Sequence, residues 1–224
     1  GALPHYFDKE AIARGDDPKK FWAKTYEYNQ SHKPVREQDE VVGHAVRAMY
    51  MYAAMADIAA ETGDAALKSA CEKLWRDVTE KRMYVTAGLG PSATNEGFTS
   101  PYDLPNETAY AETCASVALI FWAKRMLDLD CDSAYADILE LSLFNGALSG
   151  LSRDGVHYFY ANPLESDGTH QRWTWHPCPC CTMNVSRLVA SVGNYFYSHN
   201  SETVAVHLYG SNTAVIKLGG TNVT

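Results

Sequence analysis

The chain has 224 residues, of which 46% are hydrophobic and 21% charged, and its formal net charge is −8. That length allows a sizeable core in one or two domains, and the composition is that of an ordinary globular protein. Because the net charge is negative and the sequence contains no run of Lys or Arg that could bind phosphates, nucleic acid is excluded as a partner. The longest apolar stretch, residues 115–122, is far shorter than the ~20 residues that cross a bilayer, so a membrane-spanning helix is excluded too.

Helical periodicity dominates most of the chain. Residues 1–35 predict one short helix among scattered aromatic side chains. Apolar residues that recur every three or four positions predict further helices over residues 39–62, 116–129, 133–148 and 182–197. Gly63 is expected to end the first of these, which contains His44, and Asp64 to cap another helix directly after it.

Three segments do not fit a helix. Residues 84–106 are rich in glycine and proline, which predicts a long loop of the kind that often carries function. Residues 153–163 predict a β-hairpin that turns at Asp154 and Gly155. Residues 203–209 and 213–218 alternate and are β-branched, which predicts a second hairpin that opens an all-β region.

The order of these elements predicts a fold class. Helices that follow one another in antiparallel pairs are typical of a helical hairpin array or an α/α barrel. Six or seven helices are too few to close a ring of twelve, and the β region is unfinished. We therefore expect a mainly α protein and a chain that is a fragment of a longer one.

Six cysteines fall into groups with different expected roles. Cys71 and Cys131 occur at or beside helix-stripe positions and are predicted to be small buried hydrophobic residues. Cys178, Cys180 and Cys181 occupy three of four positions ahead of a helix, where a thiolate is stabilised and suited to metal binding or nucleophilic attack. Adjacent cysteines rarely bridge one another, because the disulfide geometry there is strained.

Glu112 and Cys114 offer a carboxylate and a further thiol two residues apart. On a regular helix such residues face different sides, so both can bind one ion only if the helix begins near Cys114. With Cys180 and Cys181 they would make a tetrahedral, zinc-like site with no open position for water. A metal-hydroxide hydrolase is then disfavoured, which leaves the sulfur itself as the reactive group. A structural zinc site or a disulfide among these cysteines stays open at this point.

Five segments of the sequence resemble one known family. They are residues 36–50 (REQDEVVGHAVRAMY), 97–98 (GF), 104–106 (LPN), 110–115 (YAETCA) and 178–181 (CPCC). In order and spacing, from residue 29 to residue 209, they resemble glycoside hydrolase family 127, the β-L-arabinofuranosidases. The resemblance implies a six-hairpin (α/α)6 barrel followed by β-sandwich domains. It assigns residues 1–198 to the C-terminal part of the barrel and residues 199–224 to the start of an incomplete β-sandwich.

The resemblance also implies the site residues. Cys180 would be the nucleophile, Glu96 the general acid/base and His44 a substrate contact. Cys178 is expected beside the site without being a ligand. The implied cofactor is a Zn²⁺ ion held by Glu112, Cys114, Cys180 and Cys181.

The implied activity is retaining hydrolysis that releases β-L-arabinofuranose from plant-derived arabino-oligosaccharides or glycoproteins. Glu96 would protonate the leaving oxygen while the Cys180 thiolate attacks the anomeric carbon. One departure from the family, Thr182 and Met183 in place of proline and a small polar residue, bears on the sugar pocket. The alternatives are a hydrolase of another pectic sugar on the same fold, such as an acidic deoxy sugar, and a non-catalytic structural zinc module.

The expected partner is an arabinose-containing oligosaccharide, and a homodimer is left open. Residues 1–6 show neither the basic start nor the apolar run of a secretory signal. Reduced, zinc-bound thiolates favour a cytoplasmic location, with a periplasmic one as the alternative.

Overall fold

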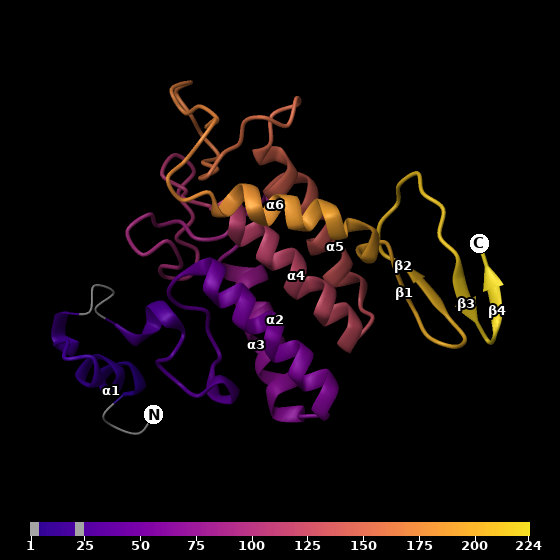
Figure 1. Ribbon diagram of the computed structural model, residues 1–224, viewed down its shortest axis with the longest axis horizontal. Helices are drawn as coiled ribbons and strands as arrows, with labels where there is room; N and C mark the ends of the chain where they lie inside the picture. The colour runs from indigo at the N-terminus through magenta and orange to yellow at the C-terminus, as the bar shows by residue number, and fades with distance from the viewer. Residues whose placement is uncertain (1–4, 21–24) are drawn as a thin grey trace.

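The computed structural model describes residues 5–20 and 25–224. Phe21, Trp22 and residues 1–4, on which part of the prediction about a secretory signal falls, lie outside the described residues. Within the described part the chain forms six α-helices and then four short strands (Figure 1). The helices are α1 Tyr6–Ala13, α2 Ala45–Thr62, α3 Ala65–Lys81, α4 Thr113–Leu129, α5 Ser133–Leu141 and α6 Cys180–Ser191. The strands are β1 Tyr197–His199, β2 Val204–Val206, β3 Ile216–Leu218 and β4 Thr221–Val223. The prediction of a mainly helical chain with β structure at its C-terminal end is confirmed.

Helices α2 and α3 form a hairpin whose turn follows from two residues. Gly63 ends α2 in the left-handed conformation, with φ 67°, which glycine adopts without steric cost. Asp64 then caps α3, because its carboxylate accepts a hydrogen bond from the backbone N–H of Leu67 at 2.9 Å. Both predictions for this turn are confirmed.

The predicted start of α2 at residue 39 is wrong. The helix begins at Ala45, and His44 is its N-cap, with Nδ1 accepting from the backbone N–H of Arg47 at 3.4 Å. A backbone conformation and a hydrogen bond keep the preceding residues out of the helix. Gly43 has a φ of 72°, and the backbone N–H of Val41 donates to the Asp77 carboxylate at 2.9 Å.

Helix α4 is the centre of the core. It packs against α2, α5 and α6, and nearly all of it is buried, as its apolar sequence between Ala115 and Ala123 requires. Trp122 is fully buried and meets the rings of Tyr52 at 5.1 Å and Trp75 at 4.9 Å. Burying a large apolar side chain stabilises a fold by about 1.5–3 kcal/mol, so this aromatic cluster ties the two helical hairpins α2–α3 and α4–α5 together.

The helix predicted over residues 133–148 is interrupted. Helix α5 ends at Leu141 and continues as one π-helical turn, Ser142–Ala147. Here the chain approaches α4 closely: the Ser142 hydroxyl donates to the carbonyl of Ser116 at 3.0 Å, and a Cβ on Gly146 would lie 2.6 Å from the Ser116 hydroxyl. The wider turn therefore accommodates a close contact between two helices.

The strands pair differently from the prediction. Strand β1 pairs antiparallel with β2, and β3 pairs antiparallel with β4, in two separate sheets. The predicted hairpin between residues 203–209 and 213–218 is therefore wrong. The first of these segments contains β2, which pairs with the preceding strand β1, and the second contains β3, which pairs with the following strand β4. Both sheets lie at one end of the molecule's long axis, and α1 lies at the opposite end (Figure 1).

The hairpin predicted over residues 153–163 is present only as a turn. Gly155, with φ 75°, donates its backbone N–H to the Ser152 carbonyl at 2.9 Å. Beyond the turn, Tyr158 forms single bridges with Leu151 on one side and Trp173 on the other. The segment is thus an irregular excursion that leads toward α6.

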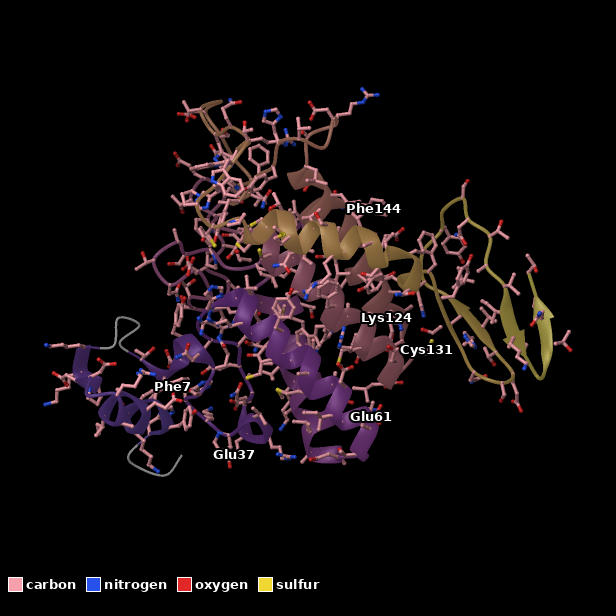
Figure 2. The ribbon with its side chains drawn as sticks, in the orientation of Figure 1. Phe7, Glu37, Glu61, Lys124, Cys131 and Phe144 are labelled. Atoms are coloured by element: carbon pink, nitrogen blue, oxygen red, sulfur yellow. The ribbon has the colours of Figure 1, made fainter. Side chains whose placement is uncertain are left out.

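Cys71 and Cys131, the two cysteines that were predicted to be buried hydrophobic residues, differ in their exposure to solvent. Cys71 is fully buried in α3, as predicted. Cys131 is exposed at the edge of the helical body (Figure 2), so the prediction that it is buried is wrong. It follows the end of α4, where the chain turns toward α5. Among the described residues no helix is long and apolar enough to cross a membrane.

Candidate active and metal site

A close crossing of two backbones brings His44 and Glu96 together. The backbone N–H of Ala45 donates to the Glu96 carbonyl at 3.0 Å, and that of Phe98 to the Gly43 carbonyl at 2.9 Å. A Cβ on Gly97 would lie 1.8 Å from the Gly43 carbonyl oxygen, so only glycine permits this approach. Glu96 itself has a φ of 51°, an uncommon conformation for a residue with a side chain. The predicted functional loop is therefore anchored directly to the start of α2.

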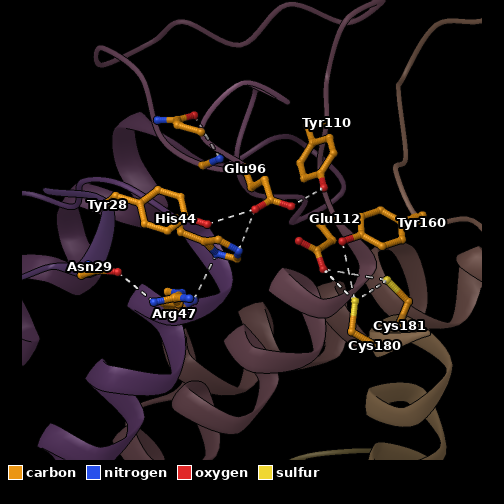
Figure 3. Close-up of polar contacts among 12 residues, drawn as sticks. Tyr28, Asn29, His44, Arg47, Glu96, Tyr110, Glu112, Tyr160, Cys180 and Cys181 are labelled. Atoms are coloured by element: carbon orange, nitrogen blue, oxygen red, sulfur yellow. Dashed lines mark hydrogen bonds and ion pairs between the residues drawn. The ribbon is translucent and has the colours of Figure 1, made fainter. Parts of the chain in front are cut away.

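Three side chains surround the Glu96 carboxylate (Figure 3). Tyr28 donates its hydroxyl to Oε2 at 3.0 Å, and Tyr110 donates to Oε1 at 3.1 Å. Nε2 of His44 lies 3.5 Å from Oε2, and burial lowers the pKa of this histidine. The Glu96 side chain keeps 34% of its surface exposed, so the carboxylate is held in place and still open to a ligand.

The predicted carboxylate and thiols converge at the starts of two helices. Glu112 is the N-cap of α4, so the helix begins at Thr113, and the expectation of a helix start near Cys114 is confirmed. Cys180 and Cys181 are the first residues of α6, which packs against α4. All four side chains offer a ligand atom within 4.8 Å of the others: Glu112, Cys114, Cys180 and Cys181.

The separations within this cluster fit a tetrahedral metal site. Sγ of Cys114 lies 3.4 Å from Sγ of Cys181, which lies 3.9 Å from Sγ of Cys180. Oε1 of Glu112 lies 3.4 Å from Cys180 and 4.0 Å from Cys181. A tetrahedron with zinc–sulfur bonds of ~2.3 Å and a zinc–oxygen bond of ~2.0 Å has edges of about 3.8 Å and 3.5 Å. Oε2 of Glu112 is buried without a hydrogen-bond partner among the described residues. The cluster could therefore hold a metal ion.

The ionisation of the cluster favours a thiolate on Cys180. Hydrogen bonds from the thiols of Cys114 and Cys181 hold the pKa of Cys180 far below its ordinary value. The same contact with Cys180, together with burial, raises the pKa of Cys114. Burial raises the pKa of Glu112 to about 8. Cys180 is also only half-buried, whereas Cys114 and Cys181 are buried, so it is the one sulfur of the cluster with access to a ligand.

The acid/base candidate and the sulfur cluster are neighbours. Ligand atoms of His44, Glu96 and Glu112 lie within 4.8 Å of one another, and Glu112 is itself in contact with Cys180 (Figure 3). The hydroxyl of Tyr160 lies 3.7 Å from Sγ of Cys180. The structure thus brings together every site residue that the sequence singled out.

Three tyrosines at the site were not predicted from the sequence: Tyr28, Tyr110 and Tyr160. The only signal for them was the position of Tyr110 in the segment 110–115, two residues before Glu112. Cys178 is exposed and lies outside the four-residue cluster, and its backbone N–H donates to Nδ1 of His176 at 3.0 Å. Its predicted place beside the site without a ligand role stays a prediction.

The fold and the site together define a class: a helical protein in which a solvent-accessible carboxylate adjoins a buried cluster of three thiols and a second carboxylate. Comparison with known families makes the assignment specific. The chain belongs to the β-L-arabinofuranosidase GH127 catalytic-domain family, whose model matches residues 2–194.

Individual relatives agree with this assignment. A non-reducing end β-L-arabinofuranosidase of Bifidobacterium longum subsp. longum is 39% identical over 98% of this chain and 36% of its own length. The crystal structure of a GH127 β-L-arabinofuranosidase from Geobacillus stearothermophilus T6 is 48% identical with a TM-score of 0.94, over 99% of this chain and 37% of that one. A second GH127 β-arabinofuranosidase structure gives 42% identity and a TM-score of 0.86, over 96% and 36%. The chain thus spans a little over a third of the length of these relatives.

Proposed function

We propose that this chain carries the catalytic pair of a retaining β-L-arabinofuranosidase, with Cys180 as the nucleophile and Glu96 as the general acid/base. The single observation that carries the proposal is the placement of these two groups on either side of Glu112, one in contact with it and the other within 4.8 Å. Membership of the GH127 family supports the substrate class, an arabinose-containing oligosaccharide.

The proposed reaction has two steps. In the first, Glu96 donates its proton to the glycosidic oxygen, the bond from the anomeric carbon to that oxygen breaks, and the Cys180 sulfur forms a bond to the same carbon. In the second, the Glu96 carboxylate takes a proton from water, and the resulting hydroxide displaces the sulfur. Two displacements at one carbon give net retention of configuration, with sulfur in the place of the usual second carboxylate.

We propose zinc as the metal, held by Glu112, Cys114, Cys180 and Cys181. Three thiols and one carboxylate are a donor set that suits zinc. Bound there, the ion would supply a positive charge that keeps the thiols deprotonated at neutral pH. Since four protein ligands complete the tetrahedron, the activation of water is assigned to Glu96.

Two further parts of the proposal concern the contact with the sugar and the division into domains. We propose that His44 contacts the sugar bound between the two catalytic groups, and its position 3.5 Å from Glu96 supports this. We further propose that residues 1–198 are part of an (α/α)6 barrel and that residues 199–224 begin a β-sandwich. The two helical hairpins α2–α3 and α4–α5 and the change to strands at Tyr197 support this division.

The test is turnover by the full-length protein on methyl β-L-arabinofuranoside, whose leaving group requires a proton. We expect release of arabinose that is first formed in the β configuration, observed by NMR. Glu96→Gln and Cys180→Ser should each lower kcat/KM by at least about 100-fold. Glu107→Gln, a matched change at an exposed glutamate of the same part of the chain, should leave kcat/KM unchanged. A protein that binds metal and hydrolyses no furanoside would contradict the proposal and indicate a structural metal module.

A further inference from the structure

Each oxygen of the Glu96 carboxylate accepts a hydrogen bond from a different phenol. The Tyr28 hydroxyl donates to Oε2 at 3.0 Å and the Tyr110 hydroxyl to Oε1 at 3.1 Å (Figure 3). The proposed reaction uses Glu96 to move protons and gives neither phenol a part in it. The two tyrosines belong to distant segments, 68 and 14 residues from Glu96, so their convergence on one carboxylate is a property of the fold.

Tyr28 is fixed by contacts with the start of α2. It is only 5% exposed, and its carbonyl accepts hydrogen bonds from the backbone of His44 at 3.3 Å and from the Gln30 side chain at 3.1 Å. Its ring packs edge-on against the His44 ring at 5.4 Å, and the Arg47 guanidinium lies over the ring at 5.2 Å. These contacts hold the Tyr28 ring in one position, from which its hydroxyl reaches Oε2 of Glu96.

Tyr110 is held from the other side. Its backbone N–H donates to the Pro91 carbonyl at 3.2 Å, and its carbonyl accepts from the backbone of Asn162 at 3.1 Å. Its ring lies 5.9 Å from that of Tyr160, which adjoins Cys180. Tyr110 thus contacts the Glu96 carboxylate with its hydroxyl and lies beside Tyr160, the tyrosine next to Cys180.

The two contacts together determine the plane of the carboxylate. A glutamate side chain has three rotatable bonds, and Glu96 is partly exposed, so it would otherwise sample several orientations. Two donors on separate oxygens allow one plane, while Oε1, which faces only Tyr110 among these groups, keeps a lone pair for a proton or a ligand. Burial and the hydrogen bond to Glu96 raise the pKa of Tyr28 to about 12, and burial raises that of Tyr110 as well. Both phenols therefore stay donors at neutral pH.

We infer that Tyr28 and Tyr110 are positioning residues that hold the Glu96 carboxylate in the plane required for proton transfer to the glycosidic oxygen. The inference rests on the proposed function. A displacement of about 1 Å in a catalytic group can cost ~100-fold in rate, so loss of either phenol affects the step that needs the proton. A glycoside whose leaving group departs without protonation escapes most of that loss.

The experiment compares two glycosides of the same sugar in the full-length protein, one with a methyl and one with a 4-nitrophenyl leaving group. Since kcat/KM reports the first, bond-breaking step, Tyr28→Phe and Tyr110→Phe should each lower it about 10–100-fold for the methyl glycoside. For the nitrophenyl glycoside the loss should be less than about 3-fold, because that leaving group needs little acid catalysis. Tyr84→Phe, which removes a buried phenol bound to the Pro105 carbonyl at 3.0 Å, is the matched control and should show no such dependence.

Each outcome is decisive. Equal losses on both glycosides, or no loss on either, would overturn the inference, because a merely structural role does not distinguish leaving groups. A wild-type protein that cleaves neither glycoside would overturn the proposed function and this inference with it. The two variants are made separately, so that a folding defect in one, detected as a lowered Tm, leaves the other to decide.

Discussion

At the scale of single residues, the site depends on one contact between two glycines. Gly43 and Gly97 lie so close that a single added methyl group on Gly97 would overlap the Gly43 carbonyl. Because Glu96 and His44 directly adjoin these glycines, the crossing sets the distance between the two side chains. Local sequence pattern alone does not predict such an approach, since it joins segments that are more than fifty residues apart.

Gly97→Ala should therefore damage both stability and activity. The Cβ would lie 1.8 Å from the Gly43 oxygen, so the two backbones must separate, at a cost of about 1–3 kcal/mol. We expect a lower Tm in thermal unfolding and a lower kcat/KM in the full-length protein. Gly193→Ala is the control, because a Cβ there meets nothing within 4 Å, and it should leave both unchanged. Equal behaviour of the two variants would contradict this account of the crossing.

Metal content tests the assignment of ligands one residue at a time. Glu112→Gln removes the carboxylate charge without changing the side chain's size, so elemental analysis should show less than one metal ion per chain, or a more easily chelated one. Cys178→Ser should retain the metal, because Cys178 is exposed and lies outside the cluster. Loss of metal from the Cys178 variant alone would require a different ligand set.

At this scale the sequence predicted the site through residue type and spacing. Glu112 and Cys114 were expected to face one point only if a helix began between them, and α4 begins at Thr113. Tyr28 and Tyr110 escaped prediction because a tyrosine is as common in cores as in sites. Their hydrogen bonds to Glu96 arise from the tertiary fold, which no local pattern records.

At the scale of elements, a buried ion pair connects α3 to both segments of the glycine crossing. Nε of Arg82 lies 2.9 Å from the Asp77 carboxylate, and both side chains are almost completely buried. Asp77 also accepts from the backbone of Val41, and the Arg82 guanidinium donates to the Thr99 carbonyl. The end of α3 therefore holds the segment before His44 and the segment after Glu96 in one place.

Arg82→Met should destabilise the fold strongly, because the buried Asp77 carboxylate then keeps as its cationic partner only the partly exposed Lys81 ammonium, 3.3 Å away. The expected loss in the free energy of unfolding is about 3–5 kcal/mol, measured by urea denaturation. Arg125→Met removes a more exposed pair, in which Nε lies 2.7 Å from Asp57, and should cost less than about 1 kcal/mol. A double variant that also carries Asp77→Asn should recover part of the loss. Similar losses for Arg82 and Arg125 would contradict the role of this pair.

The elements differ in how far the sequence predicts them. The turn between α2 and α3 was predictable because Gly63 and Asp64 act within their own turn of helix. The start of α2 and the interruption after α5 were not, because Asp77 and Ser116 act on them from distant positions. Strand pairing failed for a similar reason: β-branched alternation identifies strands but does not select the neighbour with which each one pairs.

At the scale of the whole molecule, three histidines that are partly or fully buried contribute to the response to acid. Burial lowers the pKa of His32, His44 and His207, so these residues stay neutral in the fold. Below about pH 6.5 the unfolded chain binds more protons than the folded one, and stability falls as the pH falls through this unfolded-state value. The stability contributed by the neutral histidines is fully present above it.

We therefore expect these histidines to make Tm fall between about pH 7.5 and about pH 5. Glu112 acts in the opposite direction over this range, because burial raises its pKa to about 8 and the folded chain binds its proton there. His32→Gln should reduce this dependence, because both ring nitrogens of His32 are buried without a hydrogen-bond partner among the described residues, and charging the ring there is costly. His199→Gln, at an exposed position, is the control and should leave the dependence unchanged. A His32→Gln variant whose Tm depends on pH as that of the wild type does would contradict the assignment of a neutral His32 in the fold.

Covalent labelling shows which side chain of the site attacks the sugar. The full-length protein would be treated with a β-L-arabinofuranosyl haloacetamide and its peptides identified by mass spectrometry. We expect a sugar adduct on Cys180 that is abolished in Cys180→Ser. The adduct should be retained in Cys131→Ser, a change at a cysteine exposed at the edge of the helical body. An adduct on another residue, in a protein that still cleaves its substrate, would contradict the account.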